Sequence, residues 1–186
     1  MKKCFLFLFL ALAPISVPAR AEIVTLDAPA APNGFFDVLV NLTGVFDSPH
    51  DSDFFLGYGF DVSMSNSAVS YLGETPGMLF TDLSANPGIM AQVAGIANSI
   101  LLGPGDFTEP LNLAILHFQV TGGGPTTLTI TGDTSNPDQG LIYLTGSDPI
   151  SASASLTGVP EPRAVWLLSV AVLLLGRRLM QHRLPD

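Results

Sequence analysis

Three aspartates of this 186-residue chain are spaced closely enough to share a metal ion. They are Asp47, Asp51 and Asp53, in the segment DSPHDSD. Hard oxygen ligands close together in sequence suit calcium, so this segment is our candidate for a structural calcium site. It lacks the glycine and the terminal glutamate of an EF-hand loop. A solvated loop between two strands is the alternative interpretation, and residues 133–138 form a weaker acidic candidate.

Motifs for catalysis are missing between residues 22 and 158. This segment has two histidines, His50 and His117, and no Gly-x-Ser-x-Gly elbow, phosphate loop or His-Glu-x-x-His pair. His117 alternates with Leu116 and Phe118, which predicts a solvent-facing side chain. The segment has no lysine, and the only cysteine of the chain is Cys4, so disulfides and thiol or amine nucleophiles are excluded. We expect a non-enzyme without a cofactor, apart from the calcium considered above.

A glycosidase is the enzymatic alternative, because its chemistry needs only two paired carboxylates. Phe54, Phe55 and Tyr58 directly follow the aspartate segment. Exposed aromatic rings could stack on sugars, whereas large aromatic side chains more often supply buried area in a core. The sequence leaves both interpretations open and favours the core.

Apolar residues alternate with period two in several runs that are bounded by Gly, Pro, Asn and Asp, a pattern typical of strands. The runs cover residues 36–42, 58–65, 112–120, 126–131, 141–144 and 150–156. Residues 89–102 are ambiguous between one helix and strands. Many short strands at spacings of about 8–12 residues predict an all-β, antiparallel sandwich or barrel for residues 22–158.

The N-terminus has the features of a secretory signal peptide over residues 1–21. Lys2 and Lys3 precede an apolar run at residues 4–13, and Ala19 and Ala21 form a small-x-small cleavage site. The mature chain is therefore expected to begin at Glu22. Signal peptidase is an expected partner during export.

The C-terminus, residues 159–186, combines three features in order. Val159, Pro160, Glu161 and Pro162 are followed by the apolar residues 164–176 and then by Arg177 and Arg178. Thirteen residues span about 20 Å as a helix, less than the roughly 30 Å of a hydrocarbon core. Flanking arginines can reach the interface, and the bilayer can thin locally. We expect one transmembrane helix at 164–176, with core and interfacial helices as competing interpretations.

Charge is divided between the ends and the middle of the chain. All seven Lys and Arg residues lie in or beside the two terminal segments, and fifteen of the sixteen acids lie between residues 22 and 162. Because positive charge stays on the cytoplasmic side of a membrane, residues 22–158 are expected outside and Arg177 and Arg178 inside. Nucleic acid is excluded as a partner of the middle segment, because phosphate binding needs Lys and Arg.

The Val159–Pro162 motif, the apolar run with Trp166 and the Arg177-Arg178 pair together resemble a PEP-CTERM sorting signal. The resemblance implies recognition of Pro160, Glu161 and Pro162 by an exosortase, a membrane-embedded protease, in a Gram-negative bacterium that makes exopolysaccharide or biofilm. Two features depart from the pattern. Arg163 directly follows the motif, and the tail continues beyond the arginines to Asp186.

A second resemblance covers roughly residues 35–156. The runs FDVSMS at 60–65 and LAILHFQV at 113–120, the glycine turn at 122–124 and TLTI at 127–130 resemble a cohesin-type domain. That family implies a nine-stranded jelly-roll β-sandwich related to carbohydrate-binding modules. No dockerin-contact residue of the family can be carried onto a position of this chain, and a fold does not establish a function.

The sequence thus predicts an exported, non-catalytic protein that begins as a membrane-anchored precursor. It would then reach the cell surface or extracellular matrix and bind a glycan or a protein partner. A small secreted hydrolase acting on matrix polysaccharide is the main alternative, and a spacer protein without a ligand is a further one. The mutual repulsion of acids that have no Lys or Arg partner could be offset by calcium or by hydration.

Overall fold

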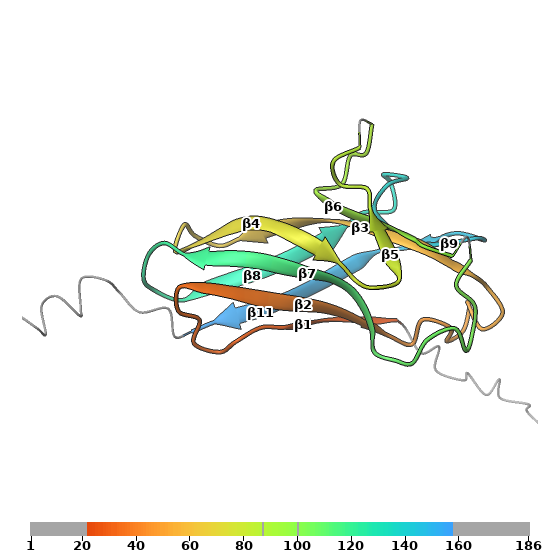
Figure 1. The fold of residues 1–186 in the computed structure, drawn as a ribbon, viewed down its shortest axis with the longest axis horizontal. Coiled ribbons are helices and arrows are strands. Elements are labelled where there is room, and N and C mark those ends of the chain that lie inside the picture. Colours follow the sequence, from red (N-terminus) through yellow and green to blue (C-terminus); the bar gives the residue numbers. More distant parts are fainter. Residues whose placement is uncertain (1–21, 87, 100, 158–186) are drawn as a thin grey trace, which may run out of the picture.

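Eleven β-strands form the regular structure of the protein in a computed structural model, which describes residues 22–86, 88–99 and 101–157 (Figure 1). No helix occurs among these residues, and none of their segments meets the length and apolarity of a membrane-spanning helix. The strands are β1 (Ile23–Asp27), β2 (Phe35–Thr43), β3 (Phe55–Met64), β4 (Val69–Pro76), β5 (Phe80–Asp82), β6 (Val93–Ala97), β7 (Leu111–Val120), β8 (Thr126–Gly132), β9 (Gly140–Tyr143), β10 (Ser147–Asp148) and β11 (Ile150–Leu156). All pairs are antiparallel, which confirms the predicted all-β, antiparallel class.

Four strands form the first sheet, in the order β1-β2-β7-β4. Its two central strands pair from Phe35 opposite Gln119 to Leu42 opposite Leu111, with an irregularity between Val40 and Asn41. Val38, Val40 and Leu42 are fully buried, and the residues between them are more exposed. The alternation therefore turns one face of β2 toward the second sheet.

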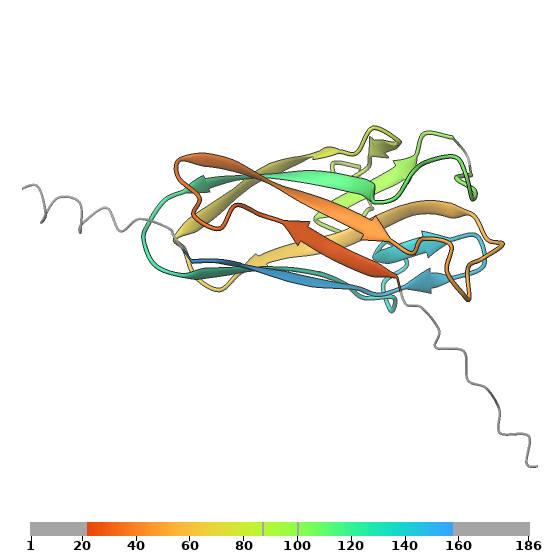
Figure 2. The ribbon, with the colours of Figure 1, turned by 90° about the horizontal axis from the view of Figure 1, so that it is seen from below.

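The second sheet is organised around the long strand β3. The first half of β3 pairs with β9 on one side and β6 on the other, and its second half, from Asp61 to Met64, pairs with β8. The outer strands are β10 beside β9, β5 beside β6 and β11 beside β8. The two sheets lie face to face (Figures 1 and 2).

A single cluster of apolar side chains fills the space between the sheets. Its largest fully buried members are Tyr58, Phe55, Phe60 and Phe118, each at most 1% exposed. The apolar residues of the predicted runs at 112–120 and 126–131 also lie in it, for example Leu116 and Ile130. Without disulfides between residues 22 and 158, the fold is stabilised chiefly by burial of these side chains.

The ambiguous segment 89–102 contains strand β6 and an isolated bridge from Leu102 to Phe55 rather than a helix. Gly95 allows this strand to pack closely against the core. An added Cβ at this position would lie 2.6 Å from the ring of Tyr58, so only glycine lets β6 lie against that aromatic side chain. The predicted signal peptide at 1–21 and the predicted transmembrane helix at 164–176 lie outside the described residues, as do Val159, Pro160, Glu161, Pro162, Arg177 and Arg178.

Strands β1 and β11 lie side by side and run in the same direction, at the edges where the two sheets meet (Figure 2). At their start, the side chains of Glu22 and Asp148 both approach His50. At their end, the backbone N–H of Thr157 donates to the carbonyl of Ala30, at 3.2 Å. Residues 22 and 157 therefore lie at opposite ends of the sandwich.

Candidate metal centre

His50 lies in the loop between β2 and β3, which a series of turns folds against the sandwich. The backbone N–H of His50 donates to the carbonyl of Asp47 at 2.7 Å, and that of Asp53 donates to the carbonyl of His50 at 3.1 Å. At the start of the loop, the Glu109 carboxylate accepts from the N–H groups of Gly44 and Val45, each at 3.0 Å. Because a charged acceptor satisfies two backbone donors, Glu109 holds the loop in place.

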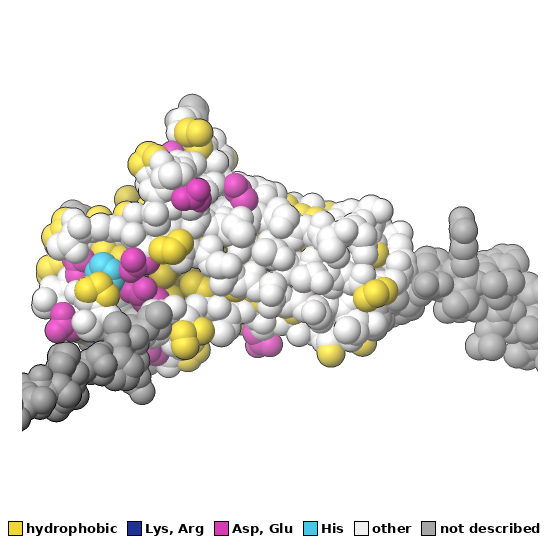
Figure 3. Space-filling model, turned by 180° about the vertical axis from the view of Figure 1, so that it is seen from behind, with side chains coloured by type: hydrophobic (Ala, Val, Ile, Leu, Met, Phe, Trp, Pro, Cys, Tyr) yellow, Lys and Arg dark blue, Asp and Glu magenta, His cyan; other side chains and the backbone are white. Residues whose placement is uncertain are grey.

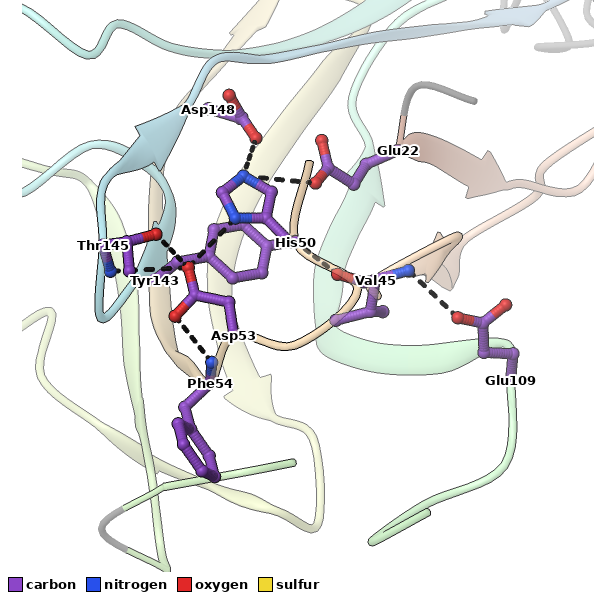
Figure 4. A network of polar contacts seen from close by, with 9 residues as sticks. All are labelled: Glu22, Val45, His50, Asp53, Phe54, Glu109, Tyr143, Thr145 and Asp148. Atoms are coloured by element: carbon purple, nitrogen blue, oxygen red, sulfur yellow. Dashed lines mark hydrogen bonds and ion pairs between the residues drawn. The ribbon is translucent and has the colours of Figure 1, made fainter. Parts of the chain in front are cut away.

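The imidazole of His50 is only 8% exposed, and both of its nitrogens face carboxylates (Figure 4). Nδ1 lies 3.0 Å from Oδ2 of Asp53. Nε2 lies 2.7 Å from Oδ2 of Asp148 and 3.8 Å from Oε1 of Glu22. The three acids come from distant parts of the chain: before β1, in the β2–β3 loop and at the end of β10.

Asp53 is the buried support of the imidazole. Its carboxylate accepts from the backbone N–H of Phe54 at 2.7 Å and from the hydroxyl of Thr145, in addition to its contact with His50. These bonds fix the carboxylate, and the carboxylate in turn fixes the orientation of the ring, so that Nε2 points toward Glu22 and Asp148. A carboxylate on one nitrogen and an outward-facing second nitrogen form the arrangement that supports metal-binding histidines.

Tyr143 covers one face of the imidazole. The two rings stack with centroids 3.8 Å apart and planes 3° from parallel, and the Tyr143 hydroxyl donates to the carbonyl of Val45 at 3.1 Å. The ring and the loop that carries it are therefore held by the last residue of β9.

Glu22 and Asp148 complete the cluster, and their side chains differ in exposure to solvent. The Glu22 side chain is 11% exposed, and its Oε1 is buried without a hydrogen-bond partner among the described residues. Asp148 is 34% exposed and so remains open to solvent. Among the described residues, Glu22, His50 and Asp148 form the one cluster whose ligand atoms all lie within 4.8 Å of one another.

Burial and mutual contacts shift the protonation of these groups. Burial, and next the negative charge of Asp148, raise the pKa of Glu22. Burial opposes the charged form of His50, but its hydrogen bonds with Asp53 and Asp148 outweigh it and raise the pKa of the imidazole. Burial also opposes ionisation of Asp53, yet the hydrogen bonds from Thr145 and the Phe54 N–H lower its pKa. Without a bound metal, the cluster therefore favours ionised Asp53 beside protonated His50.

No protein-family model, curated protein or solved structure shows a significant match to the chain. The PEP-CTERM and cohesin-type resemblances therefore stay predictions.

The predicted calcium residues do not lie in one cluster among the described residues. The Asp53 carboxylate is directed inward to His50 and Thr145, whereas Asp51 is exposed and Asp47 is half-buried. Calcium binding by Asp47, Asp51 and Asp53 stays a prediction, and Asp53 has a different partner from the one expected. The sequence search missed Glu22 and Asp148 and gave no role to His50. Its one available signal was a histidine placed within the acidic segment.

A half-buried acid, Glu74, lies away from this cluster. Glu74, on β4, accepts a hydrogen bond from the Ser84 hydroxyl, which itself accepts from the N–H of Ala94 at 2.8 Å. Burial raises the pKa of Glu74 to about 7, with the charge of Asp82 acting in the same direction and the Ser84 hydrogen bond against it. Glu74 and Asp82 do not line the nearby apolar pocket of about 200 Å³, whose only carboxylate is Asp138.

The other residues considered from sequence have structural positions. Phe55 and Tyr58 are in the core, which confirms the packing interpretation for these two rings, while Phe54 is 37% exposed. His117 is about one-third exposed and lies between Asp37 and Thr75, at 2.8 Å from each. It therefore faces the outer side of the first sheet, as predicted.

The described part of the chain has acidic side chains and histidines but no Lys or Arg. The view in Figure 3 shows acidic side chains gathered around a histidine at one end of the molecule. Acids on this surface therefore have histidine as their only possible cationic side-chain partner among the described residues.

Proposed function

We propose that the protein is an exported, non-catalytic surface protein that is trimmed at both ends and whose folded part binds a partner in the extracellular matrix. The observation that carries the proposal is the match between charge and fold. The strands occupy Ile23–Leu156, and every Lys and Arg lies outside this segment. A folded part that is free of positive charge translocates readily, whereas basic terminal segments stay on the cytoplasmic side.

In this proposal signal peptidase cleaves after Ala21, and an exosortase recognises Pro160, Glu161 and Pro162. The residues 164–176 anchor the precursor in the inner membrane of a Gram-negative bacterium, with Arg177 and Arg178 inside. The mature protein then resides at the cell surface or in the exopolysaccharide matrix.

A cohesin-like jelly roll is the finer fold that we propose for residues 22–158. The chain crosses between the sheets repeatedly: β1 and β2 are in the first, β3 in the second, β4 in the first, β5 and β6 in the second and β7 in the first. Such crossings between two antiparallel sheets are typical of jelly rolls. Binding of partners is common to many proteins with this architecture, although the fold alone assigns no ligand.

The exposed side chains suit a protein partner as well as a glycan. The rings of Phe55 and Tyr58 are at most 1% exposed and offer no face on which a sugar could stack, whereas Phe54 is 37% and Phe35 is 74% exposed. Exposed aliphatic side chains are present as well, among them Met78, Met90 and Ile96. A hydrolase would need two carboxylates facing one groove. Asp138 is the only carboxylate that lines the pocket beside β6, and Asp106 is the only one that lines the pocket beside Met78.

Intact mass spectrometry of the protein from the surface and medium of its native host tests this proposal. The expected species begins at Glu22 and ends near Pro160–Pro162. Glu161→Ala should retain the C-terminal segment, and Asp186→Ala, which removes the one acid beyond the motif, should be trimmed like wild type. Normal trimming of Glu161→Ala, or a wild-type species that still carries Arg177 and Arg178, would refute sorting by an exosortase.

Incubation of the mature protein with the host's matrix polysaccharide tests the non-catalytic part. We expect no new reducing ends. Release of reducing ends that is lost in Glu74→Gln or Asp138→Asn would show a hydrolase instead.

A further inference from the structure

We propose that Glu22, His50 and Asp148 form a binding site for a divalent transition-metal ion of the zinc type. The proposal does not depend on the sorting signal or on the partner proposed above. It rests on the arrangement of the three side chains, on the support behind His50 and on an unpartnered buried oxygen.

The spacing of the ligand atoms suits a small dication. Zinc binds imidazole nitrogen and carboxylate oxygen at about 2.0–2.2 Å in a tetrahedron, which places neighbouring ligand atoms about 3.3 Å apart. Nε2 of His50 lies 2.7 Å from Asp148 Oδ2 and 3.8 Å from Glu22 Oε1, on either side of that value. Asp148 is partly exposed and lies on the two-residue strand β10, so its carboxylate has room to move outward by the small distance required.

The contacts that hold the His50 ring in place are those typical of a metal-binding histidine. Asp53 contacts Nδ1 and is itself held by the Phe54 N–H and the Thr145 hydroxyl, while Tyr143 covers the ring (Figure 4). These contacts orient Nε2 toward the two remaining carboxylates before any ion binds. Such supporting contacts commonly change metal affinity by about 10–100-fold when removed.

A hydrolytic triad does not explain the arrangement of Glu22, His50 and Asp148. The hydroxyl of Thr145 donates to Asp53 and that of Tyr143 to the carbonyl of Val45, so neither is hydrogen-bonded to the imidazole. The Nε2 atom, which would have to activate a nucleophile, faces carboxylates instead. A nitrogen among carboxylates is a ligand set and not a nucleophile–base pair.

The buried oxygen Oε1 of Glu22, which has no hydrogen-bond partner among the described residues, also points to a ligand. A buried carboxylate oxygen without a hydrogen-bond partner is costly, and this atom faces Nε2 across 3.8 Å. Residues 22–157 contain no Lys or Arg, so His50, at 3.8 Å, is the only side chain near this oxygen that can carry positive charge among the described residues. A dication between Glu22, His50 and Asp148 would satisfy this oxygen and offset the repulsion between the two carboxylates.

The ligand types favour zinc over calcium. Calcium takes six to eight oxygen ligands, whereas imidazole is a ligand for zinc, copper, iron and nickel. Three protein ligands leave a fourth position, on the side where Asp148 is exposed. The bound ion would join the residue before β1, the β2–β3 loop and β10 at one end of the sandwich.

Isothermal titration of Zn²⁺ tests the proposal, with the protein expressed from the complete sequence and purified after export. We expect one ion per chain, a dissociation constant in the micromolar range or below, proton release on binding and a melting temperature raised by several degrees. Ca²⁺ and Mg²⁺ should bind at least 100-fold more weakly.

Variants locate the site. His50→Gln should abolish Zn²⁺ binding, and Asp148→Asn should weaken it at least 30-fold. Asp148→Asn changes a partly exposed side chain, so the test holds even where His50→Gln does not fold. His117→Gln is the matched control, because His117 also contacts an aspartate, Asp37, at 2.8 Å, and it should bind Zn²⁺ within twofold of wild type. Absence of saturable Zn²⁺ binding by the wild type, stronger binding of Ca²⁺, or unchanged Zn²⁺ affinity in Asp148→Asn would overturn the proposal.

Discussion

The imidazole of His50 lies flat on the ring of Tyr143, with centroids 3.8 Å apart and planes within 3° of parallel. This contact joins the β2–β3 loop to the end of β9 and sets the plane in which both imidazole nitrogens meet carboxylates. The His50–Tyr143 pair therefore connects the packed strand β9 to the cluster of Glu22, His50 and Asp148.

Replacement of His50 by phenylalanine should separate stacking from charge. The new ring can still stack on Tyr143, but Asp53 and Asp148 lose their partner. We expect the free energy of unfolding at pH 7 to fall by about 3 kcal/mol, because one partner of a buried ion pair is removed. Urea unfolding measures this loss, and His117→Phe, at the more exposed pair with Asp37, should cost under about 1 kcal/mol. Equal losses in the two variants would contradict the role of burial.

Asp53→Asn should lower stability by about 2 kcal/mol at neutral pH, since the charged acceptor of several hydrogen bonds is lost. The pKa of Asp53 is lower in the folded protein than in the unfolded chain. Its contribution is therefore present above the ordinary aspartate pKa of about 3.9 and is lost as the pH falls through the folded pKa. Denaturation curves of wild type and variant should thus converge on acidification. Asp51→Asn, in the exposed part of the same loop, should change stability little at any pH.

Glu74 gives the opposite dependence on pH. Its pKa is about 7 in the folded protein, against an ordinary value of 4.5, so the folded state retains this proton to higher pH than the unfolded chain. Its stabilising effect is full below pH 4.5 and is lost as the pH rises through 7. We expect a loss of roughly 2 kcal/mol from this group after allowance for solvent screening. Glu74→Gln should remove that part of the slope between pH 5 and 8 and should be the more stable protein at pH 8. A slope unchanged by the substitution would contradict the assignment to Glu74.

Gly59 should tolerate no side chain. A Cβ added there would lie 1.8 Å from the carbonyl oxygen of Asp138, in the turn before β9. Because that neighbour is backbone, Gly59→Ala should shift the chain and cost more than about 3 kcal/mol or prevent folding. Gly146→Ala is the control, since nothing lies within 4 Å of the added atom and the residue has no positive φ. Thermal melting of the two variants gives the comparison.

The alternation of apolar residues in the sequence predicted the main strands, because Val38, Val40 and Leu42 must share a face wherever β2 is placed. The short strands β1, β5 and β10 have five residues or fewer and gave no comparable signal. The cluster of Glu22, His50 and Asp148 could not be predicted from the sequence, because Asp148 lies 98 residues beyond His50 in the chain. Only the pairing of β10 with β9, and of β9 with β3, brings the two side chains together.

The parallel course of β1 and β11 determines how the molecule would transmit force. A partner held near His50 and an attachment beyond Thr157 would pull on opposite ends of the sandwich, along the direction of the strands. Strand β11 pairs with β8 over seven consecutive positions, from Ile150 to Leu156. Hydrogen bonds in such a ladder lie across the strands, so tension along β11 would load them together in shear instead of opening them one by one. The whole β8–β11 ladder would thus resist such tension at once.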